Sequence, residues 1–453
     1  MKMKKKESSI APVSNQDTTI HSVTRRRFLE TSVIAGAGTL LGTTPFTRTG
    51  QAPLVNAGFY KGMCYQPMPF YVDPVRGATQ PYSPSIANTT RIFFGSDIAY
   101  NCMEPLWGES FTSQSGITYR GRDDVTSLKR MGVNLVRLYD WEPRNYHKKF
   151  LDRCQAHGIK VLVPVSNYFL KPGEGYPNRL ELIPNLIRSF SNGGQNNGSD
   201  YHPAIAGIIM GNEPRLHGFT AAECVQFTKD WVSIEQDQFS GFSMPPIAHP
   251  VDFERYGGRY PAWGFFTPLL QGLSNTTIRN LQSRLFLAAN TFNDAFYLFQ
   301  NAENSGQGYV KLTYDQFQKP LLFTEIGEDR TKPNYLQKVD GQLRESIAYG
   351  AAHPEQLLGI CHFQFDDKVW LCQSRSCNDP EGSFGTHSHI PERFRGTVIY
   401  AAADFTHFDC KPGTGCTPGC PPCVPCDNVP MKPDMLDRNL TYNEVVKNYI
   451  GRP

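Results

Sequence analysis

Two glutamates, Glu213 and Glu325, each lie at the end of a short apolar run. Glu213 follows the run at 204–210, and Glu325 follows the run at 320–323. Both runs are too short and too apolar for amphipathic surface helices, so each predicts a buried parallel strand. Glycoside hydrolysis requires two carboxyl groups at one site, one protonated and one ionised. The two segments therefore predict the active site of a glycosidase.

Each segment alone also has a simpler interpretation. Glu213 precedes Pro214, and the residue before a proline is driven toward extended backbone, so this segment could merely mark the end of a strand. The matched positions of the two glutamates favour catalysis over that interpretation, because catalysis needs both groups at equivalent strand ends.

Short apolar runs alternate with helical stretches from residue 58 onward, which is the pattern of repeated βα units. Strands are expected at 59–67, 134–139, 159–165, 204–210, 246–250, 285–290, 320–323 and 358–365. Helices are expected at 123–131, 145–157, 180–190, 221–236, 343–352 and 441–450. This order predicts an α/β protein, a (β/α)8 TIM barrel with long loop insertions. Because the carboxyl ends of barrel strands meet on one face, Glu213 and Glu325 are expected to lie close together.

A long polar and aromatic excursion, 68–119, separates the first strand from the first helix. A loop of this length in a compact domain is usually functional. We expect this loop to line the part of the active site that binds the donor sugar, with Trp107 available to stack on a sugar ring. The alternative is that its aromatic rings form a small core of the loop itself.

The N-terminal segment, residues 1–57, has the features of a targeting signal. Thr24–Leu29 reads Thr-Arg-Arg-Arg-Phe-Leu and precedes a weakly apolar stretch at 31–41. This resembles a twin-arginine export signal, with a cleavage site near Val55–Ala57. The alternative is a basic disordered tail before a short buried helix. Export would place the mature barrel, 58–453, in the periplasm or outside the cell. The apolar stretch is too short to span a membrane, so no membrane association beyond the signal is expected.

The chain has 12 cysteines, several of them in a Pro/Gly-rich stretch at 368–435 that is expected to be an insertion or a tail. The cysteines concerned are Cys410, Cys416, Cys420, Cys423 and Cys426, with Cys372 and Cys377 as a second local pair. In an oxidising compartment they predict a disulfide-stapled loop. Their close spacing leaves a metal-binding knot as the alternative.

Composition limits the classes of partner. With 453 residues, of which 40% are hydrophobic and 12% aromatic, the chain can bury a large core. A formal net charge of +3 without a basic stripe argues against nucleic acid. A polysaccharide or oligosaccharide is therefore the expected partner, and two carboxyl groups need no cofactor. The sequence leaves the oligomeric state open.

Four segments resemble one group of enzymes. They lie at 61–67 (Lys-Gly-Met-Cys-Tyr-Gln-Pro), 136–139 (Val-Arg-Leu-Tyr), 211–213 (Gly-Asn-Glu) and 323–325 (Phe-Thr-Glu). Together they resemble the clan A retaining glycoside hydrolases, most closely the family 72 β-1,3-glucanosyltransferases, with the family 17 β-1,3-glucanases second. The resemblance runs from residue 60 to residue 365.

The chain departs from the family 72 pattern in three places. Ser166 and Asn167 stand where that family has an acidic residue, and Ile326 follows the second glutamate where the family has an aromatic. Asn290 and Phe292 lie where its tyrosine is expected after the sixth strand.

The resemblance implies a role for each site residue. Glu213 would be the general acid and base, Glu325 the nucleophile, and Asn212 a hydrogen-bond partner of the sugar 2-hydroxyl. Arg137 would lie near Glu325 and keep it ionised, although a structural ion pair at the barrel rim is the alternative. Four further residues would contact the substrate, Tyr65, Gln66, Tyr139 and, from its position at a strand end, His249.

The expected function is an exported retaining β-glycoside hydrolase or transglycosylase that acts on a glucan-like polysaccharide, with β-1,3-glucan as the first choice. A β-1,4-glucanase or mannanase on the same barrel is an alternative. A non-catalytic carbohydrate-binding protein of the cell surface is another.

Overall fold

The computed structural model describes residues 58–67, 70–72, 79–81, 97–99, 104–112, 118–143, 145–170, 179–194, 198–253, 260–274, 281–367, 380–389 and 436–451. The export signal expected at 1–57 and the cysteine cluster expected at 410–426 lie outside these residues.

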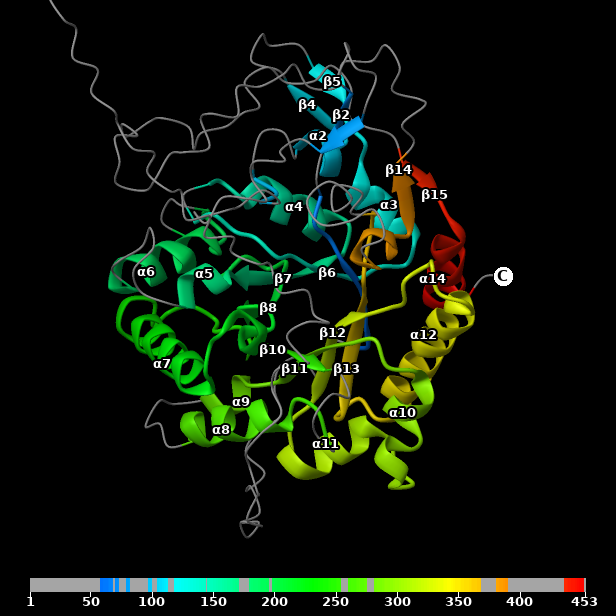
Figure 1. Cartoon of the computed structure of the whole chain (residues 1–453). Helices are drawn as coiled ribbons and strands as arrows, with labels where there is room; N and C mark the ends of the chain where they lie inside the picture. The colour runs from blue at the N-terminus through cyan, green and yellow to red at the C-terminus, as the bar shows by residue number, and fades with distance from the viewer. Residues whose placement is uncertain are drawn as a thin grey trace, which may run out of the picture. The chain divides into compact units, whose positions relative to one another are not determined.

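Nine of the described strands form one parallel barrel sheet (Figure 1). Its members are β1 (Tyr60–Cys64), β6 (Leu135–Arg137), β7 (Lys160–Val165), β8 (Ile205–Met210), β9 (Ile247–Ala248), β10 (Pro250–Phe253), β11 (Leu287–Thr291), β12 (Leu321–Ile326) and β13 (Leu357–His362). The order is β10-β11-β12-β13-β1-β6-β7-β8-β9. Only His249 separates β9 from β10, so the two share one strand position and close the sheet. Eight positions result, as predicted.

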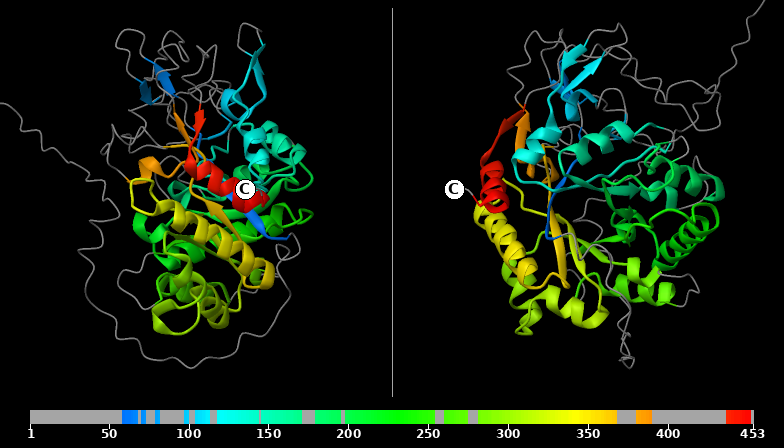
Figure 2. Two further views of the ribbon diagram at one scale, coloured as in Figure 1. Left: turned by 90° about the vertical axis from the view of Figure 1, so that its right-hand side faces the viewer. Right: turned by 180° about the vertical axis from the view of Figure 1, so that it is seen from behind.

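A helix follows each strand position in the chain. These helices are α3 (Asp124–Arg130), α4 (Lys148–Ala156), α6 (Arg179–Ser189), α7 (Ala221–Gln238), α8 (Trp263–Ser274), α11 (Tyr309–Phe317), α12 (Tyr335–Ala352) and α14 (Leu440–Ile450). The last helix, α14, packs along α12 beside the start of the barrel (Figure 2). The (β/α)8 TIM-barrel prediction is therefore confirmed.

Shorter elements lie in the connections. They are β2 (Phe70–Val72), β3 (Thr79–Pro81), α2 (Glu104–Trp107), β4 (Ser110–Thr112), β5 (Thr118–Arg120), α5 (Asn167–Leu170), η3 (Pro214–His217), α9 (Leu281–Arg284), α10 (Ala295–Phe299), η4 (Ala302–Asn304), η5 (Pro380–Ser383), β14 (His387–His389) and β15 (Leu436–Arg438). The pairs β2–β3, β4–β5 and β14–β15 are antiparallel hairpin-like additions to the barrel.

Local sequence fixes the start of the long helix α7. The Thr220 hydroxyl accepts a hydrogen bond from the Glu223 backbone N–H at 3.2 Å, and the Glu223 carboxylate accepts one from the Thr220 N–H at 2.8 Å. This reciprocal capping box satisfies two backbone donors that a helix start leaves free. It begins α7 eight residues after Glu213, so the catalytic candidate remains in the turn before the helix.

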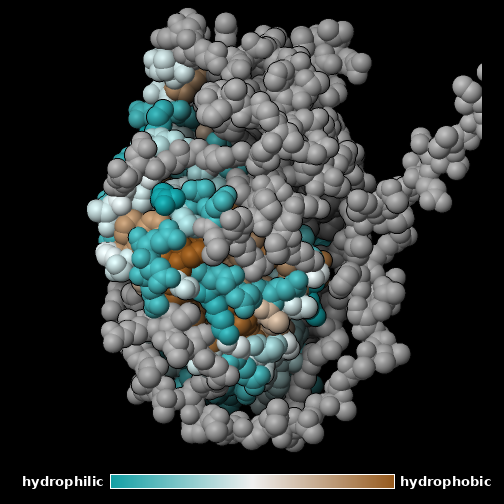
Figure 3. Space-filling view, turned by 90° about the vertical axis from the view of Figure 1, so that its left-hand side faces the viewer, coloured by the Kyte–Doolittle hydropathy of each residue, from teal (hydrophilic) through white to brown (hydrophobic). Residues whose placement is uncertain are grey.

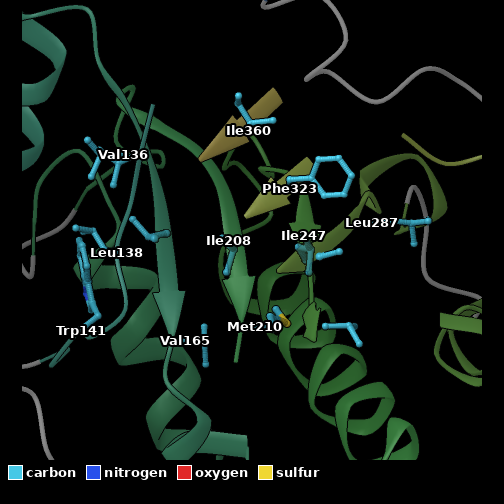
Figure 4. Packing of buried hydrophobic residues seen from close by; sticks show 14 of the residues in the cluster. Val136, Leu138, Trp141, Val165, Ile208, Met210, Ile247, Leu287, Phe323 and Ile360 are labelled. Carbon is cyan, nitrogen blue, oxygen red and sulfur yellow. The ribbon is translucent and has the colours of Figure 1, made fainter. Parts of the chain in front are cut away.

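The hydrophobic core has two layers because side chains alternate along each strand. The barrel interior contains Tyr60, Leu135, Leu162, Ala206, Ile209, Ala288, Leu322 and Leu358. The outer layer joins strand residues such as Val136, Ile208, Phe323 and Ile360 to the surrounding helices (Figure 4). Side chains therefore fill the barrel interior beneath the face formed by the carboxyl ends of the strands, as in other barrels of this type.

Several boundaries differ from the predicted ones, among them those of β12, α12 and the fifth strand. Strand β12 continues to Ile326 and contains Glu325, although the apolar run stops at Phe323. Parallel pairing of Glu325 with Asn290 of β11 carries the strand past its polar residues. Helix α12 begins eight residues earlier than the expected 343, and the fifth strand is interrupted at His249.

The described part of the excursion is attached to the barrel by a buried carboxylate. Asp97 is fully buried and accepts hydrogen bonds from the ring of His147 at 2.6 Å and from Asn145 at 2.9 Å. The imidazole of His147 stacks on Trp141, 3.6 Å between ring centroids. These contacts hold 97–99 against the connection between β6 and α4.

The described surface carries scattered apolar residues. The large hydrophobic side chains that are exposed, Tyr146, Phe296, Leu440 and Ile450, come from three separate parts of the chain. On the face seen in Figure 3 the described residues are mainly hydrophilic, with small hydrophobic areas between them. Within the described residues, every helix is too short or too polar to cross a membrane.

We predict that Arg284→Met lowers the free energy of unfolding by about 3 to 5 kcal/mol, since it leaves the buried Glu235 carboxylate without its cation. The Arg284 guanidinium bonds both oxygens of Glu235, at 2.6 and 3.1 Å. The matched control is Arg344→Met, whose pair with Asp340 is exposed and should contribute less than about 1 kcal/mol. Urea unfolding measures both, and equal losses would contradict the prediction.

Candidate active site

Glu325 is held by two donors from the second strand position. It lies in β12 and is 3% exposed. Its Oε1 accepts hydrogen bonds from Nη1 of Arg137 at 2.7 Å and from the hydroxyl of Tyr139 at 2.9 Å. A guanidinium and a hydroxyl bound to one oxygen fix the orientation of the carboxyl group. Glu325 is therefore held in one orientation near the carboxyl end of β12.

Arg137 is itself buried, with 1% of its surface exposed. Burial lowers the pKa of Arg137, but attraction to Tyr139 and Glu325 outweighs burial and the net shift is upward. The guanidinium carbon lies 3.7 Å from the centroid of the Tyr139 ring, within the range of a cation–π contact. The cation is thus permanently charged and packed in one orientation.

Asn212 joins the network through its side-chain oxygen. Its Oδ1 accepts hydrogen bonds from Nη2 of Arg137 at 2.6 Å and from Nδ2 of Asn290 at 2.9 Å. Two donors on the oxygen fix the orientation of the amide, so its nitrogen points away from them. That nitrogen is the group able to donate to a ligand hydroxyl.

The backbone of Asn212 is held by the side chain of Asn167. The Asn212 N–H donates to Asn167 Oδ1 at 2.8 Å, and Asn167 Nδ2 donates to the Asn212 carbonyl at 2.7 Å. Gly211 makes this approach feasible, because it has φ +76° and a Cβ there would lie 2.6 Å from Asn167 Oδ1. The turn before Glu213 therefore requires glycine.

Glu213 lies in a strained turn at the end of β8. It is 6% exposed and has φ 48°, ψ 54°, in the left-handed region. A non-glycine residue there costs on the order of 1 kcal/mol and persists only where its surroundings hold it. Its N–H donates to the carbonyl of Pro250 at 2.9 Å, and its Oε1 accepts from Nδ2 of Asn290 at 3.0 Å.

The two glutamates belong to one continuous hydrogen-bonded network. It runs from Glu213 through Asn290, Asn212 and Arg137 to Glu325. Its members come from four strand positions far apart in the sequence, and the barrel brings them to one face. The expectation that Glu213 and Glu325 share a site with Asn212, Arg137 and Tyr139 agrees with this placement.

Aromatic rings lie beside this network. Phe363 and Phe384 belong to the apolar cluster of the barrel interior, against which Phe292 and Tyr139 pack. The Phe292 and Phe384 ring centroids are 5.2 Å apart, and those of Phe363 and Phe384 are 5.4 Å apart. An aromatic surface next to paired carboxyl groups suits a sugar, whose apolar faces stack on rings.

Three expected substrate contacts are placed in the core instead. Tyr65 is fully buried and its hydroxyl donates to Asp124 at 2.9 Å. Trp107 is 5% exposed, and its indole N–H donates to the carbonyl of Ile98 at 2.7 Å. His249 is 2% exposed and bonds Thr228 of α7 at 2.8 Å. A substrate-contact role for these residues has no support in this geometry.

His249 is neutral in this setting, because burial lowers its pKa to about 4. It fills the interruption between β9 and β10 and faces α7 through Thr228. Gln66, the remaining expected contact, follows β1 and is partly exposed.

Sequence reasoning missed the connecting amides. Asn290 was noted only because it replaces an expected tyrosine, and Asn167 only because it replaces an acidic residue. Strand register gives these asparagines their roles, and no motif in a single sequence encodes that register. An asparagine in a buried strand interior is the one signal that could have drawn attention to Asn290, since such residues need hydrogen-bond partners.

Within the described residues no group of three His, Cys, Asp or Glu side chains is placed to hold a metal ion. Cys64, Cys154, Cys224 and Cys361 are buried free thiols. The expectations for Cys372, Cys377 and the 410–426 cluster lie outside the described residues.

The chain was compared with known proteins. No protein-family model matches it, and no curated protein matches it in sequence. Similar solved structures include Saccharomyces cerevisiae Gas2p in complex with laminaritetraose and laminaripentaose, with a TM-score of 0.47, 14% identity, and coverage of 87% of this chain and 63% of that chain. Another is Gas2p in complex with laminaritriose and laminaritetraose, with a TM-score of 0.45, 13% identity, and coverage of 87% and 64%. The match thus spans less than two thirds of those chains.

We predict that Trp107→Ala destabilises the protein by about 3 to 5 kcal/mol, because it removes a buried indole that packs edge-on to Phe150. Substrate kinetics measured well below the lowered melting temperature should be unchanged. Differential scanning calorimetry and steady-state assays test the two parts. A raised Michaelis constant with an unchanged melting temperature would instead make Trp107 a substrate contact.

Proposed function

We propose that this protein is a retaining β-glycoside hydrolase or transglycosylase that acts on a glucan-like polysaccharide. One observation carries the proposal: two buried glutamates from distant strands belong to one hydrogen-bonded network at the carboxyl ends of the barrel strands. Glu325 accepts from Arg137 and Tyr139, and Glu213 accepts from Asn290. A double displacement needs two carboxyl groups at one site, one protonated and one ionised.

In the first step, Glu213 gives its proton to the glycosidic oxygen as the bond to the anomeric carbon breaks. The carboxylate of Glu325 attacks that carbon and forms a glycosyl ester. In the second step, ionised Glu213 removes a proton from water or from a sugar hydroxyl, which attacks the same carbon and releases Glu325. Two inversions leave the configuration retained.

The neighbouring residues support these steps. Arg137 and Tyr139 hold the carboxylate of Glu325 in one orientation before attack, and they bond it again when the ester is cleaved. The amide nitrogen of Asn212 is placed to donate to the sugar 2-hydroxyl, a bond that strengthens in the transition state.

We propose β-1,3-glucan as the substrate, on the strength of the segment at 61–67, which resembles family 72. Laminari-oligosaccharides, the ligands of the Gas2p complexes, are therefore the first compounds to test. A β-1,4-glucanase or mannanase is the alternative enzyme. Exclusive release of products from β-1,4 polymers in a polysaccharide screen would replace the β-1,3 proposal.

A non-catalytic carbohydrate-binding protein is the alternative from another class. Such a protein has no need of two buried carboxyl groups, and burial of each is costly. Binding of laminari-oligosaccharides without any turnover by the wild-type protein would favour this alternative.

We predict that Glu325→Ala abolishes turnover, because the glycosyl ester cannot form. Added azide should restore part of the rate by attacking from the vacated position and giving a glycosyl azide of inverted configuration. The matched control is Glu328→Ala, which removes a buried carboxylate paired with Lys338 and should lower stability while turnover continues. Azide rescue in Glu213→Ala with an inverted product would exchange the two roles.

The separation of the two carboxyl groups provides an independent check. A retaining mechanism requires about 5 to 5.5 Å, and we expect that value in a crystal structure of the wild-type protein. A separation near 9 Å with an ordered water between the groups would indicate inversion.

We also propose that the protein is exported by the twin-arginine route, on the strength of the residues at 24–29. We predict that replacing Arg25 and Arg26 together by lysine keeps the positive charge but abolishes export of a fused folded reporter. Replacing Lys5 and Lys6 by arginine is the charge-matched control and should leave export intact. Undiminished export of the double lysine variant would contradict the proposal.

A further inference from the structure

Asn290 uses both ends of its side-chain amide. It lies in β11 and is 1% exposed. Its Nδ2 donates to Asn212 Oδ1 at 2.9 Å and to Glu213 Oε1 at 3.0 Å. Its Oδ1 accepts from the hydroxyl of Thr324 at 2.7 Å. This buried amide thus contacts Asn212 and Glu213, and it also contacts Thr324, the residue directly before Glu325 in β12.

Thr324 determines which end of this amide faces the glutamate. Thr324 is fully buried in β12, directly before Glu325. Its hydroxyl donates to the amide oxygen and leaves the amide nitrogen toward Glu213. In the flipped orientation Asn290 Oδ1 would face two oxygen acceptors, which is repulsive. The strand that supplies Glu325 therefore also fixes the donor to Glu213.

We propose that Asn290, oriented by Thr324, is a positioning residue that sets the geometry and the protonation of Glu213 together with the orientation of Asn212. This inference rests on the proposed function for the roles of Glu213 and Asn212. It adds that the two glutamates are coupled through Thr324 and Asn290, by a route separate from Arg137.

The hydrogen bond that Asn290 donates to Glu213 determines in which direction the pH profile of activity should shift when Asn290 is replaced. An N–H that donates to a carboxylate favours its ionised form, so loss of the donor raises the pKa of Glu213. The other charged or titratable groups at this face come from the neighbouring elements. Among the described residues they include Arg137, Tyr139, Glu325, and Asp252 with its partner Arg215. His249 shares the strand position of Asp252 but faces α7 through Thr228. None of them changes in the variants below.

Asn290→Ala should lower kcat about 10-fold and change KM little, because the acid is misplaced while Asn212 keeps its hydrogen bond from Arg137. The basic limb of the kcat/KM profile reports the loss of the Glu213 proton, so it should move to higher pH. Asn290→Asp replaces the donor by a second carboxyl group and should move that limb further in the same direction.

Thr324 offers a matched pair of variants. Thr324→Val removes the hydroxyl at nearly constant volume, frees the amide to turn, and should shift the basic limb upward by less than Asn290→Ala does. Thr324→Ser keeps the hydroxyl and should retain the wild-type profile. Comparing Thr324→Val with Thr324→Ser separates the effect of losing the hydrogen bond from the effect of changed packing.

Asn293→Ala is the control for stability. Asn293 lies just after the end of β11, three residues beyond Asn290. Its amide donates to the carbonyl of Phe253 at 3.1 Å and to Thr291 at 3.0 Å. It should lower the melting temperature without moving either limb of the profile. An Asn290→Ala variant that behaves in the same way would reduce Asn290 to a structural role and overturn the proposal.

A second measurement does not depend on substrate. The carboxyl carbon of Glu213, assigned by 13C NMR, should titrate at higher pH in Asn290→Ala and Thr324→Val than in the wild type and Thr324→Ser. This shift in a protein that turns over no β-glycan would uphold the positioning role and refute only the proposed function. An unchanged titration in both variants would overturn the positioning role, whatever the activity.

Discussion

The buried guanidinium of Arg137 is the constraint on which the site depends. A charge removed from water costs several kcal/mol unless it is paired and hydrogen-bonded. Arg137 meets this need with Glu325 through one terminal nitrogen and with Asn212 through the other. Because these partners come from β12 and from the turn after β8, both bonds form only when the barrel register is correct on both sides of β6. Folding of the barrel and assembly of the site are thus the same event.

The packed interior strengthens this ion pair. Leu135, Leu162 and Leu322 fill the barrel below the carboxyl-end face, and Cys64 and Cys361 add two buried thiols. A medium without mobile water increases the attraction between fixed charges and prevents their rearrangement. The same medium penalises any unpaired polar group, so each network member must have a partner. Asn212 and Asn290 meet that requirement with uncharged amides, which connect Arg137 to Glu213 without adding a charge to the interior.

The sequence predicted what local patterning controls and missed what register controls. The alternation of short apolar runs and helical stretches was sufficient to predict the barrel, and the runs before Glu213 and Glu325 predicted that these two residues lie on one face. Trp107 is buried although its loop is polar overall, because a buried aspartate at position 97 attaches the loop to the barrel. Asn290 acquires its role by pairing with Glu325 across strands. Such pairing depends on the closed sheet, which no short segment encodes.

The two glutamates differ in backbone as well as in donors, and this difference supports unlike roles. Glu325 is inside a regular strand, where ladder pairing restrains it and a charged donor directs it. Glu213 is in a left-handed turn between Gly211 and Pro214, after the strand has ended. A nucleophile must approach one carbon along one line, which suits the restrained strand position. An acid that later becomes a base serves two oxygens in turn, which suits a carboxyl group carried by a turn rather than by a regular strand.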